Sequence, residues 1–351
     1  MQPIISICIP TFNRATCLEN LLNNLSALTT AYKTVVEICI SNNYSSDNTI
    51  QVIDSWRDKL QLKVVTQSQN IGATKNIVEV TRLATGKWIL IMGDDDELIT
   101  SAFSSLLAYL NAAGEKDWIL AGVADKLGNE HLLGDLLPGI YQAQRFRNIV
   151  LRTGLYRYGF IGMHIFPSGW SKQLLDLSTQ AIQPWPHVAL FLRNLEVGCV
   201  RVFPVSIVKQ AAGGSELYWN PGDWVSINLR KLNILSEARK EMHKIRWFFD
   251  FLMLRELYSL RTFKDLILWK VLDPVDFQRR ALREFISSYR LLSPIGGIAT
   301  SLHCVGVFLA LYTPSIVLEM IFYLSGQHGV LAFHRELKKK LGSFDGVKRG
   351  L

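Results

Sequence analysis

The 351-residue sequence has only five cysteines, and none of them forms a CxxC pair. Cys8 and Cys39 lie inside apolar runs of the kind that form strands, where packed thiols are ordinary. An odd count without paired spacing argues against a disulfide framework and against a zinc site. We also expect no signal peptide, because the first residues are predicted to lead straight into a strand. We therefore expect the chain to work in a reducing compartment.

The first 210 residues carry little net charge, with 18 Lys+Arg against 17 Asp+Glu. Residues 211–351 hold 20 Lys+Arg and 13 Asp+Glu, so they supply +7 of the total charge of +8. A basic region of this kind suits either nucleic acid or an anionic membrane surface. Since its Lys and Arg alternate with Leu, Phe and Trp at helical spacing, the membrane surface is the partner we expect, and no nucleic acid.

Charge is absent from residues 291–318, which contain no Asp, Glu, Lys or Arg. A helix that spans a bilayer needs about 20 apolar residues, so the length permits a span. Pro294, Gly296, Gly297 and Pro314 interrupt the segment, and basic residues flank both of its ends. This pattern favours helices that lie in the interface or dip into one leaflet. A buried helical pair in a soluble domain and a true span are the alternatives.

Strand-like and helix-like segments alternate over residues 1–125. Apolar runs at residues 4–9, 35–41, 62–66 and 88–92 predict strands, and leucines at 18, 21, 22, 25 and 28 give the first helix a 3.6-residue period. Such alternation predicts parallel βαβ units and a layered sheet of the α/β class. We expect three parts: this alternating half at 1–125, an extension of the same domain that shapes a pocket at 126–223, and a helical, membrane-associating region at 224–351.

Three consecutive carboxylates, Asp94, Asp95 and Asp96, follow the apolar run of residues 88–92 and Gly93. Like charges this close raise one another's pKa unless a cation sits among them. Hard oxygen ligands at a strand end suit Mg²⁺ or Mn²⁺ that carries a substrate's phosphates, and open α/β sheets bind ligands at that edge. The alternative is a solvated acidic turn that caps a helix over residues 101–113.

Four polar turns at successive strand ends predict one shared ligand site. They are Pro10–Arg14, Ser41–Asp47, Gln69–Asn76 and Gly93–Asp96. Each turn by itself is ordinary, whereas the four in this order and spacing are specific. Asp47 is also a candidate N-cap for the second helix.

The segments SICIPTFNRATCLENLL, EICISNNYSSDNT, QNIGATKN and ILIMGDDDEL resemble the family 2 glycosyltransferases with the GT-A fold. Over this first third, the sequence is most similar to bacterial, abequosyltransferase-like enzymes that add sugars to lipid-linked O-antigen or capsule units. The resemblance implies an inverting transferase that takes a nucleotide-sugar donor and uses Mg²⁺ or Mn²⁺.

The resemblance also implies residue roles. Asp94 would approach the ribose, and Asp95, with Asp96 nearby, would bind the metal that bridges the diphosphate. Lys75 would lie near the base or the phosphates, and the turn at Asn42 and Asn43 would hold the base. The remaining residues that would line the nucleotide are Pro10, Thr11, Asn13 and Arg14.

Two positions depart from the family pattern. Asn42 stands where the family usually has an Asp that accepts a hydrogen bond from uracil, so the preferred base need not be uracil. The acceptor-side Glu-Asp motif is missing from residues 183–188, and His187 is our candidate for the catalytic base there, because imidazole titrates near neutrality. A hydrogen-bonded loop histidine is the alternative.

Three further residues are candidates for acceptor contacts. His164 is a second candidate base, although strand alternation could equally bury it. Asp125 follows a predicted strand at residues 118–124 and could contact donor or acceptor, or simply be a turn acid before Gly128. Trp185 could stack on a sugar face, or belong to the core.

The sequence therefore predicts a metal-dependent glycosyltransferase at the cytoplasmic face of the inner membrane, peripheral or monotopic, with a polyprenyl-diphosphate-linked glycan as acceptor. A nucleotidyltransferase would want glycine in the first turn, which Pro10–Arg14 lacks. A catalytically degenerate GT-A scaffold at the membrane is the non-enzymatic alternative.

Overall fold

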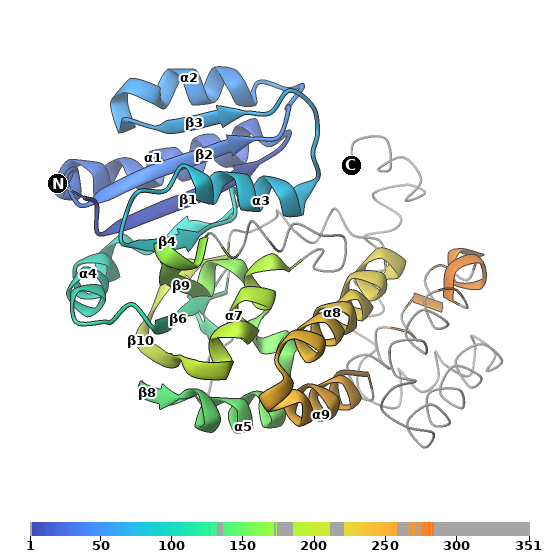
Figure 1. The fold of residues 1–351 in the computed structure, drawn as a ribbon. Coiled ribbons are helices and arrows are strands. Elements are labelled where there is room, and N and C mark those ends of the chain that lie inside the picture. Colours follow the sequence, from blue (N-terminus) through green and yellow to red (C-terminus); the bar gives the residue numbers. More distant parts are fainter. Residues whose placement is uncertain are drawn as a thin grey trace. The chain divides into compact units, whose positions relative to one another are not determined.

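The computed structural model describes residues 2–125, 127–131, 136–171, 173, 185–210 and 221–257, together with 266, 269–270, 273, 275–281 and 283. The chain forms two compact units, residues 1–214 and 215–351, and Figure 1 shows its elements. The predicted boundaries at residues 125 and 223 stay predictions. The charge-free segment of residues 291–318 lies outside the described residues. Within the described part of the chain, no helix has the length and apolar character that crossing a membrane requires.

One mixed sheet organises the first unit. Its strand order is β3-β2-β1-β4-β9-β6-β10-β5, with β7 paired to β6 and β8 paired to β10. The strands are β1 (Ile5–Thr11), β2 (Val36–Asn42), β3 (Lys63–Thr66), β4 (Trp88–Ile91), β5 (Glu97–Leu98), β6 (Asp117–Ala124), β7 (Glu130–His131), β8 (Gly139–Gln142), β9 (His164–Pro167) and β10 (Cys199–Lys209).

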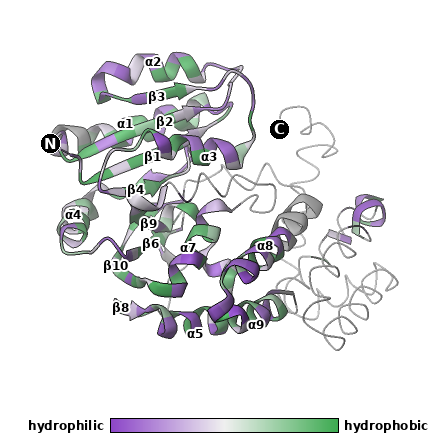
Figure 2. Cartoon of the chain, viewed as in Figure 1, coloured by the Kyte–Doolittle hydropathy of each residue, from purple (hydrophilic) through white to green (hydrophobic). Residues whose placement is uncertain are grey.

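The first four strands follow the sequence prediction, since β3, β2, β1 and β4 are all parallel. They are connected by α1 (Ala15–Tyr32), α2 (Thr49–Leu60) and α3 (Ala73–Arg82). Strand β1 has nearly all of its residues buried, as expected for a parallel strand covered on both faces. Figure 2 shows this apolar character in β1 and β2.

Period-2 alternation divides the core between the two faces of the sheet. Ile5, Ile7 and Ile9 of β1 join a buried cluster with the leucines of α1 at 18, 21, 22, 25 and 28, together with side chains of α2 and of α4 (Phe103–Asn111). Val78 of α3 is buried but lies outside this cluster. The 3.6-residue stripe predicted for α1 is therefore the side that faces the sheet.

The second half of the sheet is not built from βαβ units. Strand β9 is antiparallel to both β4 and β6, between which it lies, and β10 is parallel to β6 but antiparallel to β5 and β8. Parallel βαβ units were predicted for residues 1–125, and the antiparallel strand β9 lies outside that range. Short 3-10 turns, rather than a crossover helix, directly precede β9.

Two helices of the first unit complete the description: α5 (Ala143–Thr153) and α7 (Pro186–Val197), which pack on each other. The described part of the second unit begins with α8 (Pro221–Glu241) and α9 (Arg246–Leu257). These two helices also pack together, and ion pairs join Lys231 to Glu256 and Arg239 to Asp250. The helical character predicted for residues after 224 is confirmed over this stretch.

Candidate functional site

The acidic turn lies where two parallel strands end side by side. Strands β1 and β4 are neighbours, with Cys8 paired to Ile91, so the turns that leave them meet at the same edge of the sheet. There Thr11 Oγ1 donates to Asp94 Oδ2 at 2.7 Å. Arg14 Nη1 lies 3.3 Å from Asp94 Oδ1 and 2.6 Å from Asp95 Oδ2. The structure thus brings the first and fourth predicted turns into direct contact.

Asp94 is the most enclosed of the three carboxylates, with 6% of its surface exposed. Burial raises its pKa, while Arg14 and the Thr11 hydroxyl oppose that rise, and the resulting pKa is about 6. Its two oxygens are already held by protein groups. This carboxylate is therefore built into the edge of the sheet.

The carboxylates of Asp95 and Asp96 lie close to Gly93, which has no side chain. A Cβ on Gly93 would lie 2.8 Å from Asp96 Oδ2 and 3.0 Å from Asp95 Oδ1, so the absence of a side chain there leaves room for both carboxylates. Burial raises the pKa of Asp96 well above its usual range, and the neighbouring Asp95 and Asp94 raise it further. A cation would relieve this repulsion.

The donor chemistry of this pair fits a divalent cation. Among the described residues, no group of three or more His, Cys, Asp and Glu side chains forms a preformed metal cage. Mg²⁺ commonly uses only one or two carboxylates and takes its other ligands from water and substrate phosphates. Asp95 and Asp96 are therefore a sufficient protein contribution for a metal that arrives with a nucleotide.

Hydrogen bonds join the first turn to the second. Asn13 has φ of +52°, a left-handed conformation that Asn tolerates better than most residues. In that conformation its Oδ1 accepts from Ser46 N at 2.7 Å, and its backbone N–H donates to Ser45 Oγ at 2.9 Å. Asn42 Oδ1 accepts from Ser45 N at 3.1 Å, so this buried amide shapes the turn that follows β2.

Asp47 supports the same junction in a way that differs from the prediction. The second helix begins at Thr49 with Asn48 at its N-cap position, so Asp47 is not the N-cap. Its Oδ1 instead accepts from the backbone N–H and the hydroxyl of Thr49, and its Oδ2 accepts from Ala15 N at 3.1 Å. The carboxylate therefore joins the starts of α1 and α2.

The second and third turns are joined through amide side chains. Asn43 Oδ1 accepts from Ile71 N at 2.9 Å, and Asn43 Nδ2 donates to Asn70 Oδ1 at 2.9 Å. Gly72 follows with φ of +84°, a conformation that favours glycine, and precedes α3. Lys75 lies exposed in the first turn of that helix, in the third of the four predicted turns.

Asn76 links three of these elements and was given no role from the sequence. Its Nδ2 donates to the Ser41 carbonyl at 3.0 Å and to the Thr11 carbonyl at 3.4 Å, while its Oδ1 accepts from Ser41 Oγ at 2.7 Å. The side chain is 3% exposed. Only its position in the QNIGATKN segment could have drawn attention to it.

His164 and His187 lie in a buried aromatic cluster rather than in the acidic turn. Trp118 Nε1 can only donate, so His164 Nδ1 accepts from it at 3.0 Å and His164 Nε2 donates to the Tyr158 carbonyl at 2.8 Å. Burial and the nearby His187 lower the pKa of His164 well below its usual value. The burial of His164 agrees with the alternative that strand alternation had predicted for it.

His187 is 2% exposed and its ring centroid lies 5.1 Å from that of His164. Its Nε2 bonds the Gly159 carbonyl at 3.0 Å, which makes Nε2 the donor, and no described residue donates to Nδ1. Burial lowers its pKa to about 4. A catalytic base must reach the acceptor hydroxyl, so this geometry favours a structural role, and catalysis by His187 stays a prediction.

Asp125 and Trp185 take local structural roles in the described structure. Asp125 Oδ1 accepts from Leu127 N and Asn129 N, both at 2.9 Å, as expected for a turn acid before Gly128. The Trp185 ring lies 3.5 Å from where a Cβ on Gly159 would be. Acceptor contacts by either residue stay predictions.

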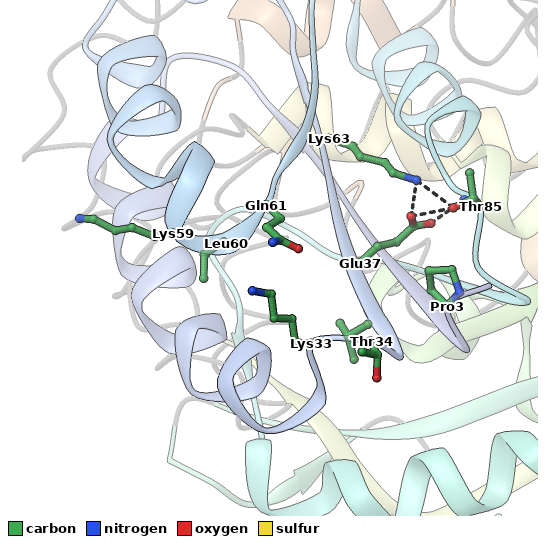
Figure 3. A pocket seen from close by; sticks show the side chains of 10 residues that line it. Pro3, Lys33, Thr34, Glu37, Lys59, Leu60, Gln61, Lys63 and Thr85 are labelled. Carbon is green, nitrogen blue, oxygen red and sulfur yellow. Dashed lines mark hydrogen bonds and ion pairs between the residues drawn. The ribbon is translucent and has the colours of Figure 1, made fainter. Parts of the chain in front are cut away.

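A separate cavity of about 640 Å³ lies near the amino ends of the parallel strands, away from the four turns (Figure 3). Glu37, near the start of β2, there accepts from Lys63 Nζ, Ser6 Oγ and the Thr85 hydroxyl. Lys33, which follows α1, and Lys59 of α2 also line it. The cavity lies at the amino ends of β2 and β3, whereas open α/β sheets bind ligands beyond the carboxyl ends of their strands, so the four turns remain the candidate site.

Comparisons with known proteins match this chain to glycosyltransferases. Residues 6–168 match the family model described as glycosyl transferase family 2. Abequosyltransferase RfbV of Salmonella typhimurium is 36% identical over 114 residues, which are 32% of this chain and 34% of that protein. The GalNAc(5)-diNAcBac-PP-undecaprenol beta-1,3-glucosyltransferase of Campylobacter jejuni is 31% identical over 112 residues, 31% of this chain and 35% of that protein.

These alignments span only about a third of each relative's length. A solved structure extends the likeness of fold: residues 1–349 of Staphylococcus aureus TarS, in complex with UDP-GlcNAc, superpose with a TM-score of 0.62 at 16% identity, covering 98% of this chain and 93% of that one. The same fragment has been solved with UDP. The mixed α/β sheet of this chain is consistent with the GT-A fold expected from the sequence.

Proposed function

We propose that this chain, whose residues 6–168 match the glycosyl transferase family 2 model, is an inverting, metal-dependent glycosyltransferase. It moves a sugar from a nucleotide-sugar donor to a polyprenyl-diphosphate-linked glycan in surface polysaccharide synthesis. The observation that carries this proposal is the contact between Thr11 and Arg14 at the end of β1 and Asp94 and Asp95 beyond β4. It lies at the carboxyl edge of the parallel strands, where such sheets bind ligands.

The four turns offer distinct groups along that edge. Neighbouring strands are about 4.8 Å apart, so a nucleotide with its diphosphate at β4 would place its ribose near β1 and its base near β2. In this arrangement Asp94 and Thr11 approach the ribose, and Asn42 and Asn43 border the base. Pro10, Asn13 and Lys75 complete the nucleotide-binding set that we propose.

Asp95 and Asp96 are the residues that would hold Mg²⁺ or Mn²⁺. When bound, the cation would stabilise the negative charge that develops on the departing diphosphate. Arg14 supplies a fixed positive charge at the same edge and would bind the phosphates directly. Because Arg14 and a metal would both contact Asp95, arrival of the metal–nucleotide complex would redirect Arg14 from carboxylate to phosphate.

The acceptor hydroxyl would attack the anomeric carbon from the face opposite the departing diphosphate, which inverts the configuration. A base must take the proton of that hydroxyl. His187 stays the candidate base, with His164, Asp125 and Trp185 on the acceptor side. The Campylobacter relative is named for an undecaprenol-linked acceptor, which supports the lipid-linked class. The cytoplasmic face of the inner membrane is the place where we expect such an acceptor.

A thermal-shift screen of the whole chain tests this proposal. UDP, GDP, CDP and dTDP are each added with Mn²⁺, Mg²⁺ or EDTA, and the apparent melting temperature is read. A ligand at 100 times its Kd stabilises by about 2.7 kcal/mol, which corresponds to roughly 5 °C or more. We expect a metal-dependent shift with one nucleotide, and its loss in Asp95→Asn.

Asp54→Asn, which removes a carboxylate from the surface of α2, is the matched control and should keep the full shift. If Asp95→Asn shifted as much as the unaltered chain, the metal role of this carboxylate would be refuted. A nucleotide shift without any donor turnover would instead support the degenerate scaffold.

A further inference from the structure

Helix α9 of the second unit carries buried apolar side chains and exposed ones. Its inner face is buried in the unit: Phe248, Phe249, Leu252 and Met253. Two other aromatic side chains of the same helix are left in solvent, Trp247 at 46% and Phe251 at 62% exposure. Residues four apart lie on the same side of a helix. We call this pair the Trp247–Phe251 face.

Exposed cations stand at the start of this face. Lys244, in the 3-10 turn before α9, and Arg246, the first residue of α9, are both exposed. The acidic residues of α9 are already engaged, since Asp250 pairs with Arg239 and Glu256 lies 2.6 Å from Lys231 Nζ. The acids of the helix therefore do little to offset Lys244 and Arg246.

Aromatic rings beside cations are the groups that helices use at a bilayer surface. Trp and Phe insert at the level of the headgroups, and Lys and Arg are attracted to anionic lipids. The +7 charge of residues 211–351 acts in the same direction. We propose that the Trp247–Phe251 face docks on an anionic lipid bilayer. This inference rests on the proposed function, because an enzyme with a lipid-linked acceptor must work at a membrane surface.

Vesicle co-sedimentation of the full chain tests the docking face. Vesicles of phosphatidylcholine alone are compared with vesicles that also contain phosphatidylglycerol. We expect binding to the anionic vesicles, weakened by salt, and a loss of about tenfold or more in partition for the double variant Trp247→Gln/Phe251→Gln. Val197→Gln, which alters a 75% exposed apolar residue at the end of α7 in the first unit, is the control and should bind normally.

A second double variant, Lys244→Glu/Arg246→Glu, tests the electrostatic part and should lose binding to anionic vesicles by about tenfold. Unchanged partition of the aromatic variant would overturn the proposal. So would a loss of self-association in that variant with vesicle binding intact, because the face would then join two copies of the chain. The nucleotide-induced thermal shift without vesicles reports on the proposed function separately.

Discussion

Three adjacent acids of the same type occupy three different environments in this structure. Asp94 is enclosed and bonded by Thr11 and Arg14, Asp95 pairs with Arg14, and Asp96 approaches the space that a side chain on Gly93 would fill. The sequence does not show which of the three carboxylates is most enclosed. In the structure it is Asp94, and burial raises its pKa to about 6, while the assignment of Asp95 and Asp96 to a metal stays a prediction.

The buried histidines give a pH dependence at the residue scale. The pKa of His187 is about 4 in the folded chain, against an ordinary value of 6.5, so between these values the unfolded chain binds the proton more strongly. The neutral ring of His187 therefore makes its full contribution to the free energy of unfolding above pH 6.5. As pH falls toward 4, on the order of 3 kcal/mol of that contribution is lost. His164 acts in the same direction.

We therefore expect His187→Gln to flatten the fall in urea midpoint between pH 7 and pH 4.5. His243→Gln, at an exposed position of the second unit, is the control and should leave the slope unchanged. An equal slope in His187→Gln and the unaltered chain would show that this ring does not titrate as its burial implies.

At the scale of the elements, the candidate site depends on how strand ends are held together. Parallel pairing brings the ends of β1, β2 and β4 to one edge, but pairing does not fix the turns beyond them. Side-chain amides do so here: Asn13 and Asn42 shape the second turn, Asn43 fixes the third, and Asn76 joins β1 to β2. These turns are thereby ordered before any ligand binds.

Replacing Asn76 should loosen this edge. Asn76→Ala removes one donor from the Thr11 carbonyl, which keeps the N–H of Asn43, and it removes the bonds of the Asn76 amide to the Ser41 carbonyl and hydroxyl, which should cost about 1–3 kcal/mol of stability. The nucleotide-induced thermal shift should decrease as well, because the first and second turns lose their common anchor. The measurements are the urea midpoint and the thermal shift. Asn23→Ala, on the exposed side of α1, is the control, and equal behaviour of the two variants would contradict the anchoring role.

At the scale of the whole molecule, the sheet joins residues that the sequence pattern separates. Strand β9 lies between β4 and β6, so a strand from residues 164–167 completes a sheet begun by residues 5–124. Trp118 of β6 stacks on Phe166 of β9 with ring centroids 5.0 Å apart. The parts expected at residues 1–125 and 126–223 therefore share one sheet.

A truncation tests this dependence. Residues 1–125 alone would leave facing edges of β4 and β6 without β9, and we expect this fragment to show no cooperative thermal transition. Residues 1–214, which form a compact unit, should retain one. Circular dichroism melts of the two fragments make the comparison. A cooperative melt of the shorter fragment would show that the first half of the sheet folds independently.

The sequence by itself determined the parallel half of the fold and the edge at which the candidate site lies. Apolar runs, helical leucine spacing and polar turns are local signals, and parallel topology carries their ends to a common edge. Only the tertiary structure decided the rest. The insertion of β9, the burial of His187 and the anchoring by Asn76 depend on contacts between residues distant in the chain, which no local pattern encodes.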